Sequence, residues 1–118
     1  MDPLILAGDK VVPLVLKQVK DKNMRRRRYA IGFLGNGSYK QALQSLETIL
    51  QDATEEDYFR GDALQSIYMI DEFRGRELAK RYTDRQDYLG EIARRVIAGD
   101  SQLKKRRTYS EAVVGKHE

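Results

Sequence analysis

With 118 residues, the chain has the length of a single domain, and folding at this size removes roughly two-thirds of the unfolded surface from water. Hydrophobic residues make up 41% of the sequence and charged residues 34%, a balance typical of a thin core under a heavily charged surface. The chain has no cysteine and its single histidine is His117, which excludes disulfides, thiol nucleophiles, Cys/His zinc sites and nearly all histidine acid–base chemistry. We therefore expect no catalytic residue, no metal site and no cofactor.

No membrane segment is expected from the sequence. The longest apolar runs, residues 4–7 and 11–16, are far shorter than the ~20 residues that a membrane-spanning helix requires. Asp2 and Pro3 also interrupt the cationic start that a signal peptide needs, so we expect a cytoplasmic protein. The net charge of +4 permits acidic partners without requiring them.

Three helices are predicted at the beginning of the chain. Asp2 and Pro3 can open a short helix that carries Leu4 and Ile5 and ends at Gly8, forming an N-terminal lid. Asp9 can cap a second helix of about eleven residues, and a third helix from 24 to 34 stops at the Gly-Asn-Gly turn 35–37. The apolar positions of these two helices are Val11, Val12, Val15 and Val19, then Met24, Ala30, Ile31, Phe33 and Leu34.

Cap patterns indicate where the later helices begin. Ser38 with Gln41 is a capping-box pattern before an apolar stripe at 42–50, and Thr54 with Asp57 predicts a cap before a helix that ends near Ile70. A shorter helix is expected over 74–82, and Asp84 can cap a last long helix. The apolar positions of that last helix are Tyr88, Leu89, Ile92, Ala93, Val96 and Ile97.

The helices pair into an imperfect repeat. The first helices of two pairs match at an offset of 31, which places Val19 on Leu50 and Asp21 on Asp52, and the second helices match at 33, which places Arg27 on Arg60. A third pair, 74–98, matches weakly and suits an end cap. We expect an all-α fold over 1–98, a short right-handed stack of antiparallel helix hairpins (an α-solenoid of about two and a half repeats), with a basic, flexible tail at 99–118.

The repeat resembles the short HEAT-like repeats of phycobilisome lyases. The residues that carry the resemblance are Leu46, Leu50 and Asp52, then Phe59, Arg60, Ala63 and Ile67, echoed by Val15, Val19, Asp21, Arg27, Ala30 and Leu34. The resemblance implies structural ion pairs of Arg27 and Arg60 with turn aspartates such as Asp21 and Asp52. It says little about function, because the family includes scaffolds, regulators, lyase subunits and DNA-repair glycosylases.

Two basic blocks have alternative interpretations. Arg25, Arg26 and Arg28 form either a solvated helix face or a contact surface for phosphates or an acidic protein, and as cations at a helix start they oppose the helix dipole. Lys104, Lys105, Arg106 and Arg107 form either a nucleic-acid arm or a solubilising tail.

These patterns favour a non-enzymatic scaffold or adaptor that binds a protein. The carboxylate pairs Glu55/Asp57 and Asp71/Glu72 sit at helix ends, where capping explains them without catalysis. The partner surface is expected on the first helices of the pairs, at Lys17, Lys20, Gln44, Glu47, Thr48 and Gln51. One alternative is nucleic-acid binding through Arg25, Arg26, Arg28 and the basic tail. Another is an accessory subunit of a lyase, and a homodimer sealed by the N-terminal lid is a further possibility.

Overall fold

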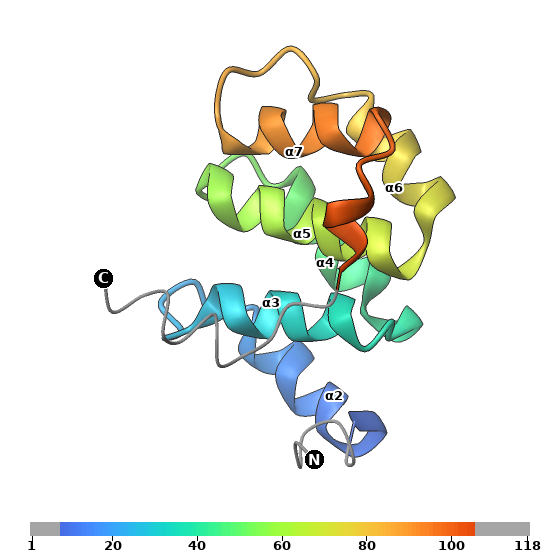
Figure 1. Cartoon of the computed structure of the whole chain (residues 1–118). Coiled ribbons are helices and arrows are strands. Elements are labelled where there is room, and N and C mark those ends of the chain that lie inside the picture. The colour runs from blue at the N-terminus through green and yellow to red at the C-terminus, as the bar shows by residue number, and fades with distance from the viewer. Residues whose placement is uncertain (1–7, 106–118) are drawn as a thin grey trace, which may run out of the picture.

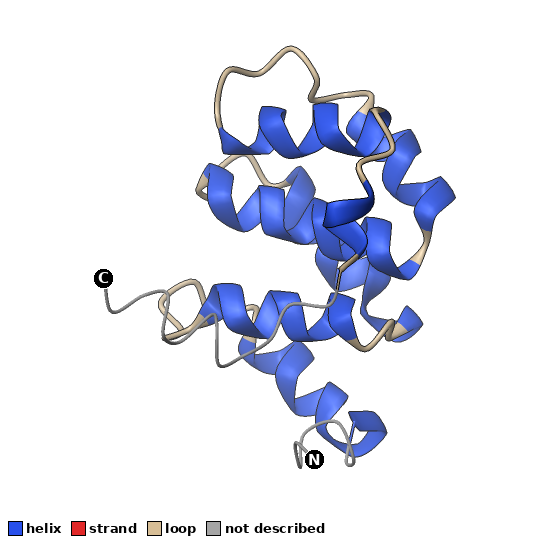
Figure 2. Ribbon diagram, viewed as in Figure 1, coloured by secondary structure: helices blue, strands red, loops and turns tan. Residues whose placement is uncertain are grey.

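The computed structural model describes residues 8–105, and the regular secondary structure within that range consists of helices joined by turns and loops, with no strand (Figure 2). This confirms the predicted all-α class. The short helix predicted between Asp2 and Gly8 falls on residues 1–7, which lie outside the described range. The elements are α2 (Gly8–Gln18), α3 (Arg27–Asn36), η1 (Lys40–Ala42), α4 (Leu43–Gln51), α5 (Asp57–Ile70), α6 (Glu72–Ala79), α7 (Tyr88–Ile97) and η2 (Ser101–Lys104), where η marks a 3₁₀ turn.

Helix α5 is the centre of the fold. It packs against α3, α4, α6, α7 and η2, and Figure 1 shows α3, α5 and α7 in successive layers with α5 in the middle. Residues 60–68 are all buried, a run of more than two helical turns, so this helix is covered on every side. A surface helix would bury one stripe, whereas a helix enclosed by its neighbours has no solvent face over that length.

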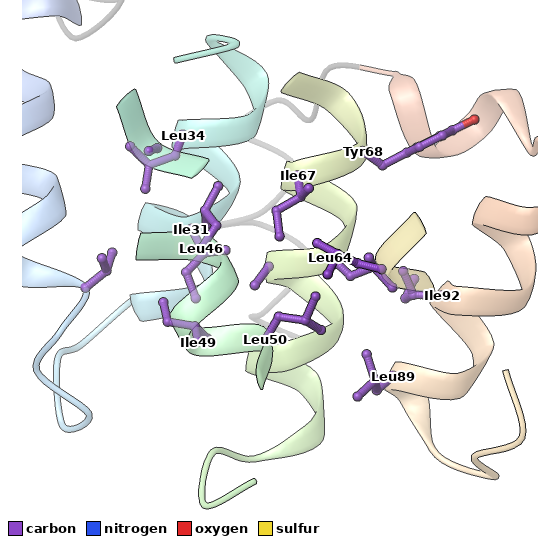
Figure 3. Packing of buried hydrophobic residues seen from close by; sticks show 14 of the residues in the cluster. Ile31, Leu34, Leu46, Ile49, Leu50, Leu64, Ile67, Tyr68, Leu89 and Ile92 are labelled. Carbon is purple, nitrogen blue, oxygen red and sulfur yellow. The ribbon is translucent and has the colours of Figure 1, made fainter. Parts of the chain in front are cut away.

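The core confirms most of the predicted apolar stripes. Side chains from α3, α4, α5 and α7 meet around α5 (Figure 3), and the fully enclosed ones include Ile31, Leu34, Leu46, Leu50, Ile67, Leu89 and Ile92. Each such Leu or Ile stabilises the fold by about 1.5–3 kcal/mol relative to an exposed side chain. Leu64 and Tyr68 also belong to the core although they were not predicted, because α5 is buried all round. The prediction for Ile97 is wrong, since this side chain is 45% exposed.

Several predicted helix starts are corrected. Helix α3 begins at Arg27 rather than Met24, because residues 21–26 form tight turns that end with Arg26 in the left-handed region at φ 58°. Ser38 does not act as a cap; it has φ 54°, and η1 intervenes before α4. Helix α7 is capped by Asp87, whose carboxylate accepts the Gly90 amide, rather than by Asp84.

The predicted cap at Thr54 is also replaced by a turn. The amide and hydroxyl of Thr54 both donate to Asp52 Oδ1, at 2.9 and 2.6 Å, and α5 starts later, at Asp57. Asp57 instead supports the start of α7, since its Oδ2 accepts the Tyr88 amide (2.8 Å). A carboxylate from one helix thus satisfies a free amide of another, which local pattern matching does not detect.

Helices α3 and α5 approach each other closely at Gly35. A Cβ on Gly35 would lie 2.7 Å from the Ser66 Cα atom, so no larger residue fits there without moving the backbone. The Ser66 hydroxyl donates to the Ile31 carbonyl (2.9 Å), which satisfies a buried polar group at the same contact. This contact fixes the separation of the two layers.

Part of the predicted tail packs on the fold. Leu103 in η2 is 1% exposed, and Gln65 Nε2 of α5 donates to its carbonyl at 3.0 Å. The packed chain therefore continues past the predicted boundary at residue 98, and residues 106–118 of the predicted tail lie outside the described range. Within residues 8–105, no helix is both long enough and apolar enough to cross a bilayer.

Candidate functional site

Arg27 joins three segments of the chain from a buried position. Its Nε donates to the Val19 carbonyl at 2.8 Å, and its Nη1 and Nη2 donate to the two carboxylate oxygens of Glu55 at 2.7 and 2.6 Å. The two side chains are only 2% and 5% exposed, and the Phe59 ring lies 4.7 Å from the guanidinium carbon. A bidentate pair of this kind is both strong and geometrically specific. It holds the end of α2 and the start of α3 against the α4–α5 turn.

Arg60 makes the equivalent backbone contact one helix pair later. Its Nε donates to the Leu50 carbonyl at 2.8 Å, and its guanidinium lies 5.5 Å from the centre of the Tyr82 ring. Val19 and Leu50 are matched positions in the sequence, as are Arg27 and Arg60. Both arginines therefore reach back to the carbonyl at the end of the preceding helix, where unpaired carbonyls need donors.

The arginine partners differ from those that the resemblance implied. Asp21 Oδ1 accepts the Asn23 amide at 2.9 Å, and Asp52 accepts from Thr54. Aspartate in a turn readily accepts such local amides, so these carboxylates are satisfied within their own turns. The carboxylate partner of Arg27 is instead Glu55, which lies in the neighbouring pair of helices.

Asp52 also links the α2–α3 turn to the α4–α5 turn. The Thr54 hydroxyl and amide lower the pKa of Asp52 to about 2, because both donate to its charged form. Lys22 from the α2–α3 turn lies 3.3 Å from Asp52 Oδ2 and donates to the Thr54 hydroxyl at 2.7 Å. The charge of Lys22 is thus neutralised by the α4–α5 turn.

Arg28 is held by an internal cluster. Its Nε and Nη2 donate to Asp62 at 2.6 and 3.2 Å, and the Tyr88 hydroxyl donates to Asp62 Oδ1 at 2.8 Å. Hydrogen bonding to the Asp62 carboxylate raises the pKa of Arg28 above its usual value. The guanidinium also lies 5.3 and 5.4 Å from the ring centres of Tyr58 and Tyr88. Arg28, predicted as a partner-binding residue, therefore links α3, α5 and α7.

Arg25 and Arg26 remain exposed on the α2–α3 turn, as do Lys17 and Lys20 at the end of α2. None of these four side chains makes an ion pair or hydrogen bond to another residue within 8–105. The bond from Arg27 Nε to the Val19 carbonyl closes this turn, so the four cations belong to one corner of the fold. We call Lys17, Lys20, Arg25 and Arg26 the basic corner.

Comparison with known proteins adds no assignment to this geometry. No protein-family model matches the chain, and neither the curated proteins nor the solved structures contain a match. The contacts described here are therefore the basis for any functional conclusion, and the HEAT-like resemblance continues as an interpretation of the residues.

The predicted surface on α4 is exposed and largely uncharged. Gln44 and Thr48 are exposed, and the Thr48 hydroxyl donates back to the Gln44 carbonyl at 3.0 Å. Glu47 on the same helix binds Arg74 of α6 through two bonds of 2.9 and 2.6 Å, and this arginine lowers the pKa of Glu47. The pair fastens α6 to α4.

The basic block 104–107 is only partly described by the structure, and its two described lysines differ in their contacts. Lys104 pairs with Glu72, lowering the pKa of that carboxyl, and its ammonium nitrogen lies 5.2 Å from the centre of the Tyr68 ring. Lys105 is exposed, and Arg106 and Arg107 lie outside the described residues. Lys104 therefore attaches η2 to α5 and α6, through Tyr68 and Glu72.

The titratable groups form structural contacts. Each carboxyl whose pKa is lowered is bound by a side-chain donor. The donor lies on a distant segment for Glu47, bound by Arg74, and Glu72, bound by Lys104. It lies within a few residues for Asp52, bound by Thr54, Asp87, bound by Arg85, and Asp100, bound by Arg95. No group of three or more possible metal ligands is found among residues 8–105.

Two partners in these contacts, Glu55 and Asp62, were missed by sequence reasoning as ion-pair residues. Asp62 lies between Gly61 and Ala63 in a predicted apolar helix and is 1% exposed. A carboxylate in such a stripe must be paired, and this was a usable signal. Glu55 offered no comparable signal, because its burial depends on how the two turns approach each other.

Proposed function

We propose that this protein is a non-enzymatic helical-repeat scaffold of HEAT-like type that binds a protein partner. One observation carries the proposal: Arg27 and Arg60, at matched positions, make the same kind of hydrogen bond. Each donates from Nε to a carbonyl at the end of the preceding helix, Val19 for Arg27 and Leu50 for Arg60, at 2.8 Å. Equal contacts at matched positions are what a stack of repeated helix pairs predicts.

Contacts between helix pairs support a rigid stack. Arg28 connects the first pair to the second through Asp62, and Arg74 connects the third pair to the second through Glu47. Helix α7 has a buried apolar face, while Glu91 and Arg94 are exposed on its other side. A polar outer face is what the end unit of a stack requires, so α6 and α7 suit the expected end cap.

The surface that best suits a protein partner lies on α4 and α6. Gln44 and Thr48 are exposed there, and Phe73, which precedes the Arg74 that binds α4, is 75% exposed. Protein interfaces are enriched in aromatic anchors and depleted in charged residues at their centres. Gln44, Thr48 and the exposed Phe73 fit that composition, and the charges of Glu47 and Arg74 on the same two helices are paired with each other.

Affinity capture from nuclease-treated native lysate tests this function. The wild-type chain is compared with Gln44→Arg and Phe73→Ser, and Gln86→Arg in the α6–α7 loop serves as a matched control for added charge. We expect one protein to be recovered by wild type and by Gln86→Arg and lost with both surface variants. Equal recovery by all four chains, or loss of every protein on nuclease treatment, would contradict the proposal.

Nucleic-acid binding is a second candidate, favoured by the basic corner. The accessory-subunit alternative rests on the resemblance alone. The homodimer prediction depends on the N-terminal lid, which lies outside the described residues, and sedimentation at two protein concentrations tests it.

A further inference from the structure

The basic corner carries charge that the fold leaves uncompensated. Of the seven cations from Lys17 to Arg28, three are neutralised internally: Lys22 by Asp52, Arg27 by Glu55 and Arg28 by Asp62. The four that remain have no partner within residues 8–105. Asp21 is the one carboxylate between residues 10 and 26, and it accepts the Asn23 amide. The corner therefore presents a concentrated positive potential.

Two features of this corner oppose stability. Arg25 and Arg26 stand at the positive end of the α3 dipole, and the first turn of this helix contains no acidic residue. Arg26 also adopts φ 58° and ψ 33°, a left-handed conformation that is unfavourable for a residue with a Cβ atom. Neither feature is offset by a contact of these side chains within the described residues. Both features are explained if Arg25 and Arg26 bind a ligand and do not stabilise the fold.

We infer that the basic corner binds the phosphate backbone of double-stranded nucleic acid. Phosphate contacts are made by flexible Lys and Arg side chains, whereas lysine is depleted in protein interfaces. Lys17 lies in the last turn of α2 and Lys20 two residues beyond its end, so both lysines belong to the same end of that helix. The positive end of α3 adds to the attraction of an anion. This activity is separate from protein binding through α4 and α6.

The four consecutive arginines then have two different roles. Arg25 and Arg26 contact phosphate. At the next two positions, Arg27 holds α3 against the α4–α5 turn and Arg28 holds it on α5. Four phosphate contacts predict a slope of about −3.6 for log affinity against log salt, which is about a 150-fold loss between 50 and 200 mM salt. The contacts are to the backbone, so binding is expected with little preference for sequence.

Fluorescence anisotropy with a labelled 20-base-pair DNA duplex, and with an RNA duplex of the same sequence, tests this inference. The corner variant Lys20→Gln/Arg25→Gln is compared with the control Lys40→Gln/Arg81→Gln, which removes the same residue types from exposed positions elsewhere. Thermal unfolding of each variant verifies that it is folded. We expect the corner variant to reduce the slope to about −1.8 and the affinity at 50 mM salt by at least about tenfold, and the control to change both far less.

Three results would overturn the inference. These are no binding of either duplex at 50 mM salt, equal losses in the corner and control variants, and displacement of the duplex by a 20-residue polyglutamate at a lower concentration than by unlabelled DNA. The last result would assign the corner to an acidic protein. The capture experiment on α4 and α6 has a separate outcome, because it uses nuclease-treated lysate and leaves the corner unchanged.

Discussion

Replacing Arg27 with methionine should destabilise the fold severely. The substitution removes one bond to the Val19 carbonyl and two bonds to Glu55, and it leaves the Glu55 carboxylate, only 5% exposed, without a counter-charge. Loss of one partner from a buried ion pair costs about 3–5 kcal/mol. Because the total free energy of unfolding of such a domain is about 5–15 kcal/mol, this is a large part of its stability.

A double-mutant cycle separates the pair from its parts. Glu55→Met should destabilise by a similar amount, because it leaves the Arg27 guanidinium buried beside Phe59 with a single carbonyl acceptor. The double variant Arg27→Met/Glu55→Met buries no unpaired charge, so we expect its free energy of unfolding to lie within about 2 kcal/mol of the wild-type value. The two single effects should therefore be far from additive.

Urea unfolding at 25 °C, followed by far-ultraviolet circular dichroism, gives the four free energies of the cycle. Two results would refute a coupled pair: free energies of unfolding of both single variants within about 1 kcal/mol of wild type, or a double variant that shows the sum of the single effects. Either result would mean that the carboxylate and the guanidinium are not coupled in the buried geometry described here.

Three further predictions concern other residues. Arg60→Ala should lower the free energy of unfolding by about 1–3 kcal/mol in urea, because the Leu50 carbonyl loses a charged donor, and an unchanged melting temperature would contradict this. Arg26→Gly should raise stability by about 0.5–1 kcal/mol in the same assay, because glycine adopts φ 58° without strain; a loss of stability would show that the backbone there is not strained. Stability should fall as pH drops from about 4 toward 2, because the pKa of Asp52 is lowered to about 2 by Thr54 and its contribution is present above the unfolded pKa. Urea midpoints between pH 5 and 2 check this, and Asp52→Asn should flatten the dependence.

The sequence was a good guide to the helices and a poor guide to their ends. Helical periodicity depends on burial of one face, so the stripes of α3, α4 and α7 were found, and Ile97 failed only because it follows the last buried turn. Asp71 caps α6 as expected, since it accepts the Arg74 amide. The predicted caps at Ser38, Thr54 and Asp84 are wrong, because the same residue types also stabilise turns. Thr54, for example, donates to Asp52, and α5 starts at Asp57 without a side-chain cap.

The candidate site was predicted in part. The matched positions of Arg27 and Arg60 indicated a shared structural role, and the structure shows one, but with helix carbonyls in place of turn aspartates. Arg28 could not be separated from Arg25 by its local sequence, because both are arginines in one run. The difference arises from Asp62, which lies 34 positions away and approaches Arg28 only in the folded chain.

The division of the arginine run is the central claim, and the most direct test compares two single variants. Arg28→Gln leaves the buried Asp62 carboxylate with the Tyr88 hydroxyl but without its cation, whereas Arg25 has no partner within residues 8–105. Urea unfolding should show Arg28→Gln to be less stable than wild type by about 2–3 kcal/mol and Arg25→Gln to lie within about 0.5 kcal/mol of it. Equal effects of the two substitutions on the free energy of unfolding would contradict the account.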